Sequence, residues 1–283
     1  MDGLVVVDKE AGWTSHDVVA KLRGILHTKK VGHSGTLDPD ATGVLLIGVG
    51  RVTRLLRFLT VLPKTYTGEV VLGVSTSTLD ASGEVVATYD MAGVSLDDVR
   101  AAAATLTGDI LQVPPMVSAV QIGGRRLHEL ARAGIEVERE PRPVTVHRFD
   151  VDATGDPLVY RVVVECSSGT YVRSLASDVG LALGGGAHLR NLRRTAIGSF
   201  TLAESRRIDA VNEGSILPPA AAVRDYPTVV ATAELLGSGK VLARSHLDVE
   251  GDGPWAVLDD SGALLAMYEP YKDETVKPAV LIA

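Results

Sequence analysis

The sequence predicts an α/β fold of the α+β kind, with a mixed, largely antiparallel sheet and a small β domain at its C-terminal end. Strand-like and helix-like segments interleave without the regular βαβ period of a doubly wound parallel sheet. The segment 218–227 is rich in proline and alanine, and the composition becomes acidic after it. We therefore expect two domains, residues 1–226 and residues 227–283.

The N-terminal elements follow from short apolar patterns. Leu4–Val7 has the composition of a strand, and Ser15 is placed to cap a helix. The apolar residues that share one face of this helix are Val18, Val19, Leu22, Ile25 and Leu26. A loop rich in Gly, Pro, Asp and Thr follows over 31–43, and Val44–Val49 is an apolar strand. Arg51–Leu59 is predicted to be helical, with arginine at every third residue.

Later segments alternate between strand and helix patterns. Thr65–Val74 has the alternation of a strand, and Ser95 with Asp98 forms a capping-box pattern before an alanine-rich helix. Strands are expected at Val144–Val151 and Leu158–Cys166, and a helix at Ser174–Leu183. In the acidic C-terminal part, strand-like pieces are expected at Trp255–Leu258, Leu264–Tyr268 and Val280–Ile282.

Composition limits the classes of protein that fit. The chain has 283 residues, 46% hydrophobic and 22% charged, which is ordinary for a globular protein with a core. No apolar run approaches the roughly 20 residues that span a bilayer, and the N-terminus lacks the pattern of a signal peptide. The single cysteine, Cys166, fits a reducing compartment. We therefore expect a cytoplasmic protein with no membrane partner.

The charge is unevenly distributed along the chain. The net charge is −7, but residues 228–283 hold four Lys/Arg against nine Asp/Glu, which leaves −2 for the rest. Two local basic segments stand out, with seven Lys/Arg in Lys21–Arg57 and five Arg in Gly186–Arg207. Because local positive surface is what contacts phosphates, a nucleic-acid partner remains compatible with the negative total.

The densest chemical signal is the segment GHSGTLDPDATG, residues 32–43. Its glycines and proline indicate a tight loop that carries His33, Asp38 and Asp40. A carboxylate held beside backbone N–H groups can act as a nucleophile or a general base. An ordinary turn, with Asp38 as its turn-forming residue, is the alternative on composition alone. A third interpretation is a metal-dependent phosphoester hydrolase with all three side chains as ligands, although no second carboxylate–histidine cluster completes such a site.

This segment closely resembles the catalytic loop of the TruB family, the bacterial tRNA pseudouridine-55 synthases. Five further segments match in the same order, so the resemblance covers about residues 3–205. They are VDKEAGWTSHDVV, KTYTGEVVLGVSTSTLDASGE, PPMVSAVQIGGRRLHELARAG, CSSGTYVRSLASDVG and AHLRNLRRTAIGSF. The resemblance implies a catalytic domain of pseudouridine-synthase type over 1–226 and a PUA-like domain over 227–283.

The resemblance also assigns roles residue by residue. Asp38 matches the essential catalytic aspartate, Tyr66 the tyrosine that stacks on the target base, and Arg173 the arginine that pairs with the catalytic carboxylate. Residues that line or guard the flipped-out nucleotide are matched by His33, Tyr171 and Leu192. Lys9 matches a lysine that supports the loop. Arg190, Arg193 and Arg194, beside such a pocket, become candidates for phosphate contacts. Asp40 departs from the family, which commonly has an apolar residue there.

The implied reaction is the conversion of uridine to pseudouridine at position 55 in the T loop of tRNA. It breaks the C1′–N1 bond and joins C1′ to C5, so we expect neither a redox cofactor nor a metal. The target nucleotide must be flipped out of the folded loop. We expect the T-stem-loop of tRNA as partner and a monomeric enzyme. An RNA-binding or chaperone module that recognises tRNA shape is a non-enzymatic alternative, and the two are not exclusive.

Overall fold

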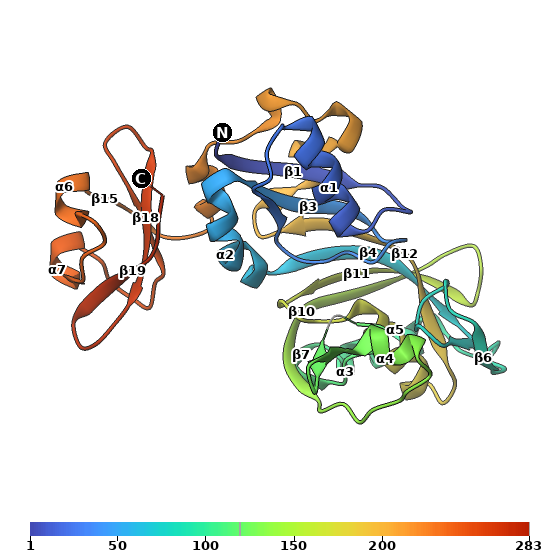
Figure 1. The fold of residues 1–283 in the computed structure, drawn as a ribbon. Coiled ribbons are helices and arrows are strands. Elements are labelled where there is room, and N and C mark those ends of the chain that lie inside the picture. Colours follow the sequence, from blue (N-terminus) through green and yellow to red (C-terminus); the bar gives the residue numbers. More distant parts are fainter. Residues whose placement is uncertain (119, 283) are drawn as a thin grey trace. The chain divides into compact units, whose positions relative to one another are not determined.

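The computed structural model describes residues 1–118 and 120–282, and the chain forms two compact units. The first unit joins Met1–Leu62 to Ile197–Ala283, and the second is the continuous stretch Pro63–Ala196. In Figure 1 the first unit therefore carries the colours of both chain ends, whereas the second carries those of the middle. The contacts thus place the C-terminal segment in the same unit as the N-terminal one. The predicted division into domains 1–226 and 227–283 stays a proposal.

The first unit contains a sheet in which β1 lies between β14 and β3, with β2 paired to β3. Its elements before the second unit are β1 (Gly3–Lys9), α1 (Ser15–Ile25), β2 (Val31–His33), β3 (Thr42–Val49), η1 (Gly50–Leu55) and α2 (Leu56–Val61). After it come β13 (Phe200–Thr201), η2 (Leu202–Glu204), β14 (Arg206–Arg207), η3 (Ile208–Ala210), η4 (Glu213–Ser215) and η5 (Pro219–Val223). β1 pairs antiparallel with β3 and parallel with β14.

Both faces of β1 and β3 are buried, which explains their continuous apolar sequences. Successive side chains of a strand point to opposite faces. Accordingly Leu4 and Val6 belong to one buried cluster, whereas Val5 and Val7 belong to another, which also contains the apolar face of α1. The strand and helix predicted here are confirmed, with one change. Thr14 is the N-cap of α1 and forms a capping box with Asp17, and Ser15 is the first helical residue.

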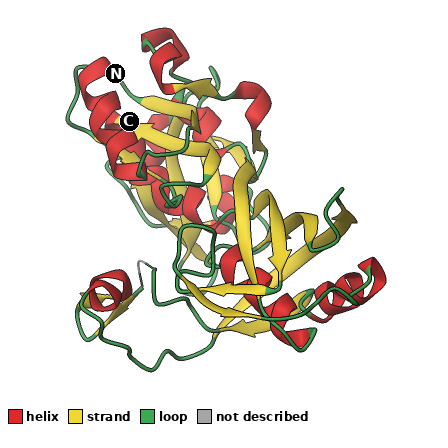
Figure 2. Cartoon of the chain, turned by 90° about the vertical axis from the view of Figure 1, so that its right-hand side faces the viewer, coloured by secondary structure: helices red, strands yellow, loops and turns green. Residues whose placement is uncertain are grey.

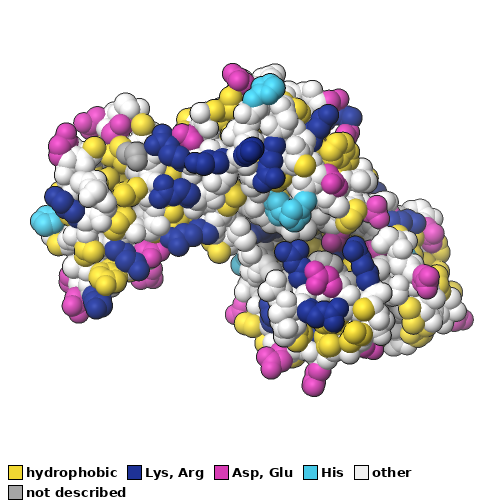
Figure 3. Space-filling model, in the orientation of Figure 1, with side chains coloured by type: hydrophobic (Ala, Val, Ile, Leu, Met, Phe, Trp, Pro, Cys, Tyr) yellow, Lys and Arg dark blue, Asp and Glu magenta, His cyan; other side chains and the backbone are white. Residues whose placement is uncertain are grey.

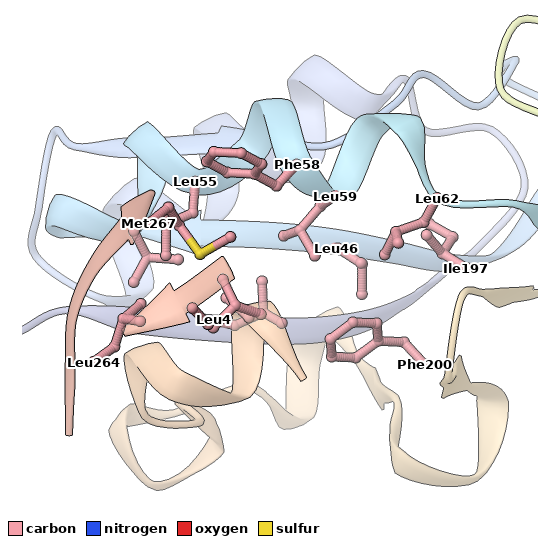
Figure 4. Close-up of a cluster of buried hydrophobic side chains, with 14 of the residues drawn as sticks. Leu4, Leu46, Leu55, Phe58, Leu59, Leu62, Ile197, Phe200, Leu264 and Met267 are labelled. Atoms are coloured by element: carbon pink, nitrogen blue, oxygen red, sulfur yellow. The ribbon is translucent and has the colours of Figure 1, made fainter. Parts of the chain in front are cut away.

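The C-terminal segment forms a five-stranded sheet in the order β15-β17-β18-β19-β16. Its elements are β15 (Thr228–Val230), α6 (Ala233–Leu236), β16 (Leu242–Ala243), α7 (Arg244–Leu247), β17 (Trp255–Leu258), β18 (Leu264–Pro270) and β19 (Thr275–Leu281). One face packs on a cluster of its own that includes Trp255 and Tyr268. The other face contributes Leu264 and Met267 to the cluster that contains Leu4 and the apolar side of α2 (Figure 4). This small sheet therefore shares a hydrophobic core with the N-terminal strands.

The second unit contains a sheet in the order β12-β4-β11-β10-β7. Its strands are β4 (Lys64–Leu72), β5 (Val74–Thr76), β6 (Val85–Thr88), β7 (Gly108–Gln112), β8 (Gln121–Ile122), β9 (Arg125–Arg126), β10 (Arg142–Ala153), β11 (Val159–Cys166) and β12 (Ala187–Ile197). Its helices are α3 (Leu96–Thr105), α4 (Leu127–Arg132) and α5 (Val172–Ala182). The inner sides of α3 and α5 pack with β4, β10 and β11 in one buried cluster.

The predicted fold class is confirmed. The ladders β4–β11, β10–β11 and β7–β10 are all antiparallel, and β1–β14 and β15–β17 supply parallel pairs. Figure 2 shows that the chain contains both helices and strands, and their order along the described residues has no regular βαβ repeat. Among the helices of the described residues, none has both the length and the apolar character needed to cross a membrane.

Candidate active site

The loop that carries Asp38 connects two antiparallel strands of the first unit. β2 pairs with β3 through Gly32↔Gly48 and His33↔Ile47, and the chain between them returns through a turn in which the amide of Ala41 donates to the carbonyl of Asp38 at 3.1 Å. Gly35 has φ +125° and Gly43 has φ +104°, conformations that L side chains rarely adopt. The glycines of the motif therefore serve the shape of this loop.

Lys9 fixes the residue that follows Asp38. Its side chain is fully buried, and its ammonium donates to the carbonyls of Glu10 at 3.0 Å, Trp13 at 2.6 Å and Pro39 at 2.9 Å. The amide of Gly12 donates to the same Pro39 oxygen at 2.9 Å. A buried ammonium is tolerated when its protons are all used in hydrogen bonds. Lys9 thus has the geometry of a loop support.

The two carboxylates of the loop differ in exposure. Asp38 is half-buried, whereas Asp40 is exposed at the turn that closes on Ala41. The extra carboxylate at position 40 therefore projects from the turn tip, where solvent screens its charge.

His33 is oriented by two neighbours within the first unit. Its Nδ1 accepts from the amide of Gly35 at 3.3 Å, so in that arrangement Nδ1 is the unprotonated nitrogen. Its ring meets the ring of His16 edge-on, with centroids 5.3 Å apart. The half-buried imidazole is therefore held beside the loop.

The second unit carries the two aromatic candidates and Leu192. Tyr66 lies on β4 opposite Val164 of β11, and both Tyr66 and Leu192 pack half-exposed against the cluster under the sheet. Tyr171 is the N-cap of α5. Its main chain is held from both sides by Gln112, whose Oε1 accepts from the Tyr171 amide at 2.7 Å and whose Nε2 donates to its carbonyl at 3.2 Å.

Arg173 occupies the second position of α5 and is almost fully buried. Its guanidinium donates to the carbonyls of Thr78 and Val117, each at 2.9 Å, and its Nε lies 3.6 Å from Oδ2 of Asp80. A cation at a helix N-terminus gains nothing from the helix dipole, so these oxygens are what stabilise it there. Asp38 belongs to the first unit and Arg173 to the second, and their pairing remains a proposal.

Asp80 is a partner of Arg173 that its local sequence does not reveal. Its Oδ1 accepts from the hydroxyls of Thr78 and Ser82, each at 2.6 Å, as in an ordinary turn. Its second oxygen, however, faces Arg173. The only signal in the sequence was an aspartate in a turn-forming segment, which is too common to indicate a partner for an arginine 93 residues away.

The three arginines of β12 differ from one another. Arg190 is exposed and bound to Glu69, with Nε and NH2 each 2.8 Å from one carboxylate oxygen. Arg193 is half-buried. Arg194 is only 1% exposed, so it has no surface for a phosphate contact and suits a supporting role instead.

Arg194 lies near a second buried cation, Lys64. The pKa of Lys64 is lowered to about 8, mainly by burial and further by repulsion from Arg194, while Cys166 acts in the opposite direction. Burial also raises the pKa of the Cys166 thiol to about 11, so this free cysteine is an un-ionised thiol at neutral pH.

The residues predicted as metal ligands do not form a recognisable centre. Among the side chains that the structure describes, no three His, Cys, Asp or Glu are grouped as a metal ion would require. The geometry therefore gives no support to the metal-ligand interpretation of His33, Asp38 and Asp40.

The arrangement described so far matches known proteins along nearly its whole length. The model of the N-terminal domain of the TruB family of pseudouridylate synthases matches residues 23–172, and that of the C-terminal domain of tRNA pseudouridylate synthase B matches 173–217. The class is thus that of the pseudouridylate synthases. The chain belongs to the TruB family.

Similar proteins share most of the chain. A tRNA pseudouridine synthase B of Rhodococcus jostii (strain RHA1) is 48% identical over 94% of this chain and 90% of its own. A tRNA pseudouridine synthase B of Streptomyces coelicolor is 46% identical over 99% of this chain and 97% of its own. Among solved structures, a chain of a Cbf5-Nop10-Gar1 complex superimposes with a TM-score of 0.72 at 26% identity, covering 96% of this chain and 79% of that one.

Proposed function

We propose that this chain isomerises uridine to pseudouridine in tRNA, at position 55 of the T loop. The observation that carries the proposal is the match to proteins named tRNA pseudouridine synthase B over nearly the full length of both chains. The hydrogen bonds that hold the loop on both sides of Asp38 support it, since a positioned carboxylate is the group that this chemistry requires. The T-stem-loop is the partner, and the enzyme acts as a cytoplasmic monomer, with a side role as a tRNA-folding chaperone.

Each site residue has a task in this reaction. The flipped-out uridine stacks on Tyr66, with Tyr171, Leu192 and His33 around the nucleotide. Asp38 initiates cleavage of the C1′–N1 bond, by attack on the sugar or the base or by deprotonation of the ribose. C1′ then bonds to C5, the C5 hydrogen leaves as a proton with the Tyr66 side-chain oxygen as its acceptor, and N1, released from C1′, takes up one proton. The product is an isomer of the substrate, so the balance needs no oxidant, reductant or metal.

Charge supports the same assignment. Arg173 close to Asp38 would keep that carboxylate ionised, because an opposite charge nearby favours the charged form. Arg190 and Arg193 contribute phosphate contacts, while Lys9 and Arg194 support the site from within. Exposed arginines on η1 and α2, Arg51, Arg54 and Arg57, add positive surface to the first unit, where Figure 3 shows basic side chains gathered around the position of α2.

The test uses transcribed tRNA with tritium at uridine C5, because forming the C1′–C5 bond releases the label. Wild-type protein releases tritium in the presence of excess chelator, and Asp38→Asn binds the tRNA without releasing it. Asn keeps the shape of Asp but is neither a nucleophile nor a base. Chelator-sensitive strand cleavage without tritium release would overturn the assignment in favour of a metal-dependent hydrolase. Binding without any product from the wild type would favour an RNA-binding module alone.

A further inference from the structure

Ser15 connects helix α1 to the loop of Asp38. Its side chain is 1% exposed. Its hydroxyl accepts from the amide of Leu37 at 2.9 Å and donates to the carbonyl of the same residue at 3.3 Å. One hydroxyl thus satisfies both main-chain groups of a residue 22 positions away.

The helix itself does not need this hydroxyl. Thr14 is the N-cap, and its side chain accepts from the amide of Asp17 at 3.1 Å while the Asp17 carboxylate accepts from the Thr14 amide at 2.9 Å. The first turn is therefore capped by Thr14 and Asp17. The hydroxyl of Ser15 is directed instead to the loop.

Leu37 is the residue directly before Asp38. Its carbonyl lies in the peptide plane that contains the amide of Asp38, so a bond to that carbonyl orients the plane from which Asp38 begins. Leu37 is itself only 4% exposed. After Asp38, the carbonyl of Pro39 is bound by Lys9 and Gly12. The backbone of Asp38 is thus held on both sides by the segment 9–15.

We propose that Ser15 is a positioning residue for Asp38. By holding Leu37, its hydroxyl orients the carboxylate for the chemical step without touching the RNA. The inference rests on the proposed function, in which Asp38 is the catalytic group. Rates respond steeply to small misplacements of a catalytic group, with ~100-fold lost for an error of about 1 Å.

The variants separate positioning from general stability. Ser15→Ala removes the only side-chain acceptor that the described structure gives the Leu37 amide, and Ser15→Cys keeps the volume but replaces the hydroxyl with a weak donor and acceptor. Thr14→Ala is the matched control, because it deletes the neighbouring hydroxyl and the cap of the same helix without touching the loop. Both alanine variants should lower the unfolding temperature by a few degrees, roughly as for other single hydrogen bonds.

The experiment measures single-turnover tritium release with enzyme in saturating excess, together with tRNA affinity and the unfolding temperature. For Ser15→Ala and Ser15→Cys we expect a rate ~10- to 100-fold below wild type with tRNA affinity within about twofold. Thr14→Ala should keep the wild-type rate at a similar loss of unfolding temperature.

Three results would overturn the inference. The first is a wild-type rate of tritium release for Ser15→Cys, or for Ser15→Ala if that variant is folded. The second is a loss of rate in Thr14→Ala equal to that in the Ser15 variants. The third is a defect of the Ser15 variants that is confined to tRNA affinity. A wild-type protein that releases no tritium would instead refute the proposed function, which keeps the two failures distinct.

Discussion

Replacing Arg173 by lysine tests whether the guanidinium geometry, rather than the positive charge, matters at the start of α5. In the structure the guanidinium spans two carbonyls, Thr78 and Val117, and also faces Asp80. An ammonium is a compact point donor on a shorter reach and cannot meet three divergent acceptors at once. The charge is conserved in Arg173→Lys, so any loss reports on geometry.

The magnitude follows from the contacts. Hydrogen bonds to charged groups contribute about 1.5–3 kcal/mol each, and the side chain of Arg173 is 5% exposed, so water does not replace a lost partner. Losing one carbonyl contact should therefore lower the free energy of unfolding by about 1.5–3 kcal/mol. If the same guanidinium also pairs with Asp38, a similar loss of transition-state stabilisation corresponds to a rate lower by ~10- to 150-fold.

The assay combines urea unfolding with single-turnover tritium release at saturating enzyme. Arg161→Lys is the control, because Arg161 is an exposed arginine on β11 of the same unit and should change neither quantity. An Arg173→Lys variant with wild-type stability and rate would refute the reasoning, whereas a loss of stability with no loss of rate would refute the pairing with Asp38 and confine Arg173 to a structural role.

Three further predictions concern other parts of the chain. Tyr66→Phe should bind tRNA as wild type does but turn over at least ~10-fold more slowly, because the ring stacks and the hydroxyl transfers the proton; an unchanged single-turnover rate would contradict that role. Lys64 has its pKa lowered from 10.5 to about 8, mainly by burial, so between these pH values the unfolded chain binds more protons than the folded one. The contribution of Lys64 to the free energy of unfolding should thus rise as pH increases through 8. Urea unfolding at pH 7 and pH 9 should show a smaller rise of this free energy in Lys64→Met than in wild type. An equal rise in both proteins would count against a buried ammonium. Removing residues 228–283 would take Leu264 and Met267 out of the buried cluster that contains Phe58 and Leu59 of α2. We therefore expect a much lower unfolding temperature or aggregation, and an unchanged unfolding temperature would show that the shared core contributes little.

The sequence was sufficient for the elements whose patterns are local. The apolar runs of β1 and β3, the alternation in β4 and the capping pattern before α3 all lie within a few residues of one another, and each predicted its element. Ser15 shows where local reasoning stops. A serine at a helix start is most often a cap, and only the packed structure shows that Thr14 takes this role while Ser15 binds Leu37.

The candidate site was harder to predict for the same reason. Asp38 lies in a dense motif, whereas Gln112 and Asp80 act on residues 59 and 93 positions away through main-chain clamps and an ion pair. Contacts between residues so far apart in the sequence leave no periodic pattern or characteristic spacing by which they could be predicted. Burial is equally non-local, and Arg194 resembles a surface arginine until the fold shows it enclosed.

The first unit is made from the two ends of the chain, and this sets an order for folding during synthesis. Residues 63–196 are contiguous and can complete their unit as soon as they leave the ribosome. Leu4, by contrast, shares a cluster with Val280 and Ile282, which are synthesised long after it. Closing so long a loop is slow, and the apolar surfaces of β1 and α2 stay uncovered until it closes. The time during which this protein is exposed to aggregation or to a chaperone is therefore set by the delay between the synthesis of β1 and the synthesis of β18 and β19, whose residues complete its core.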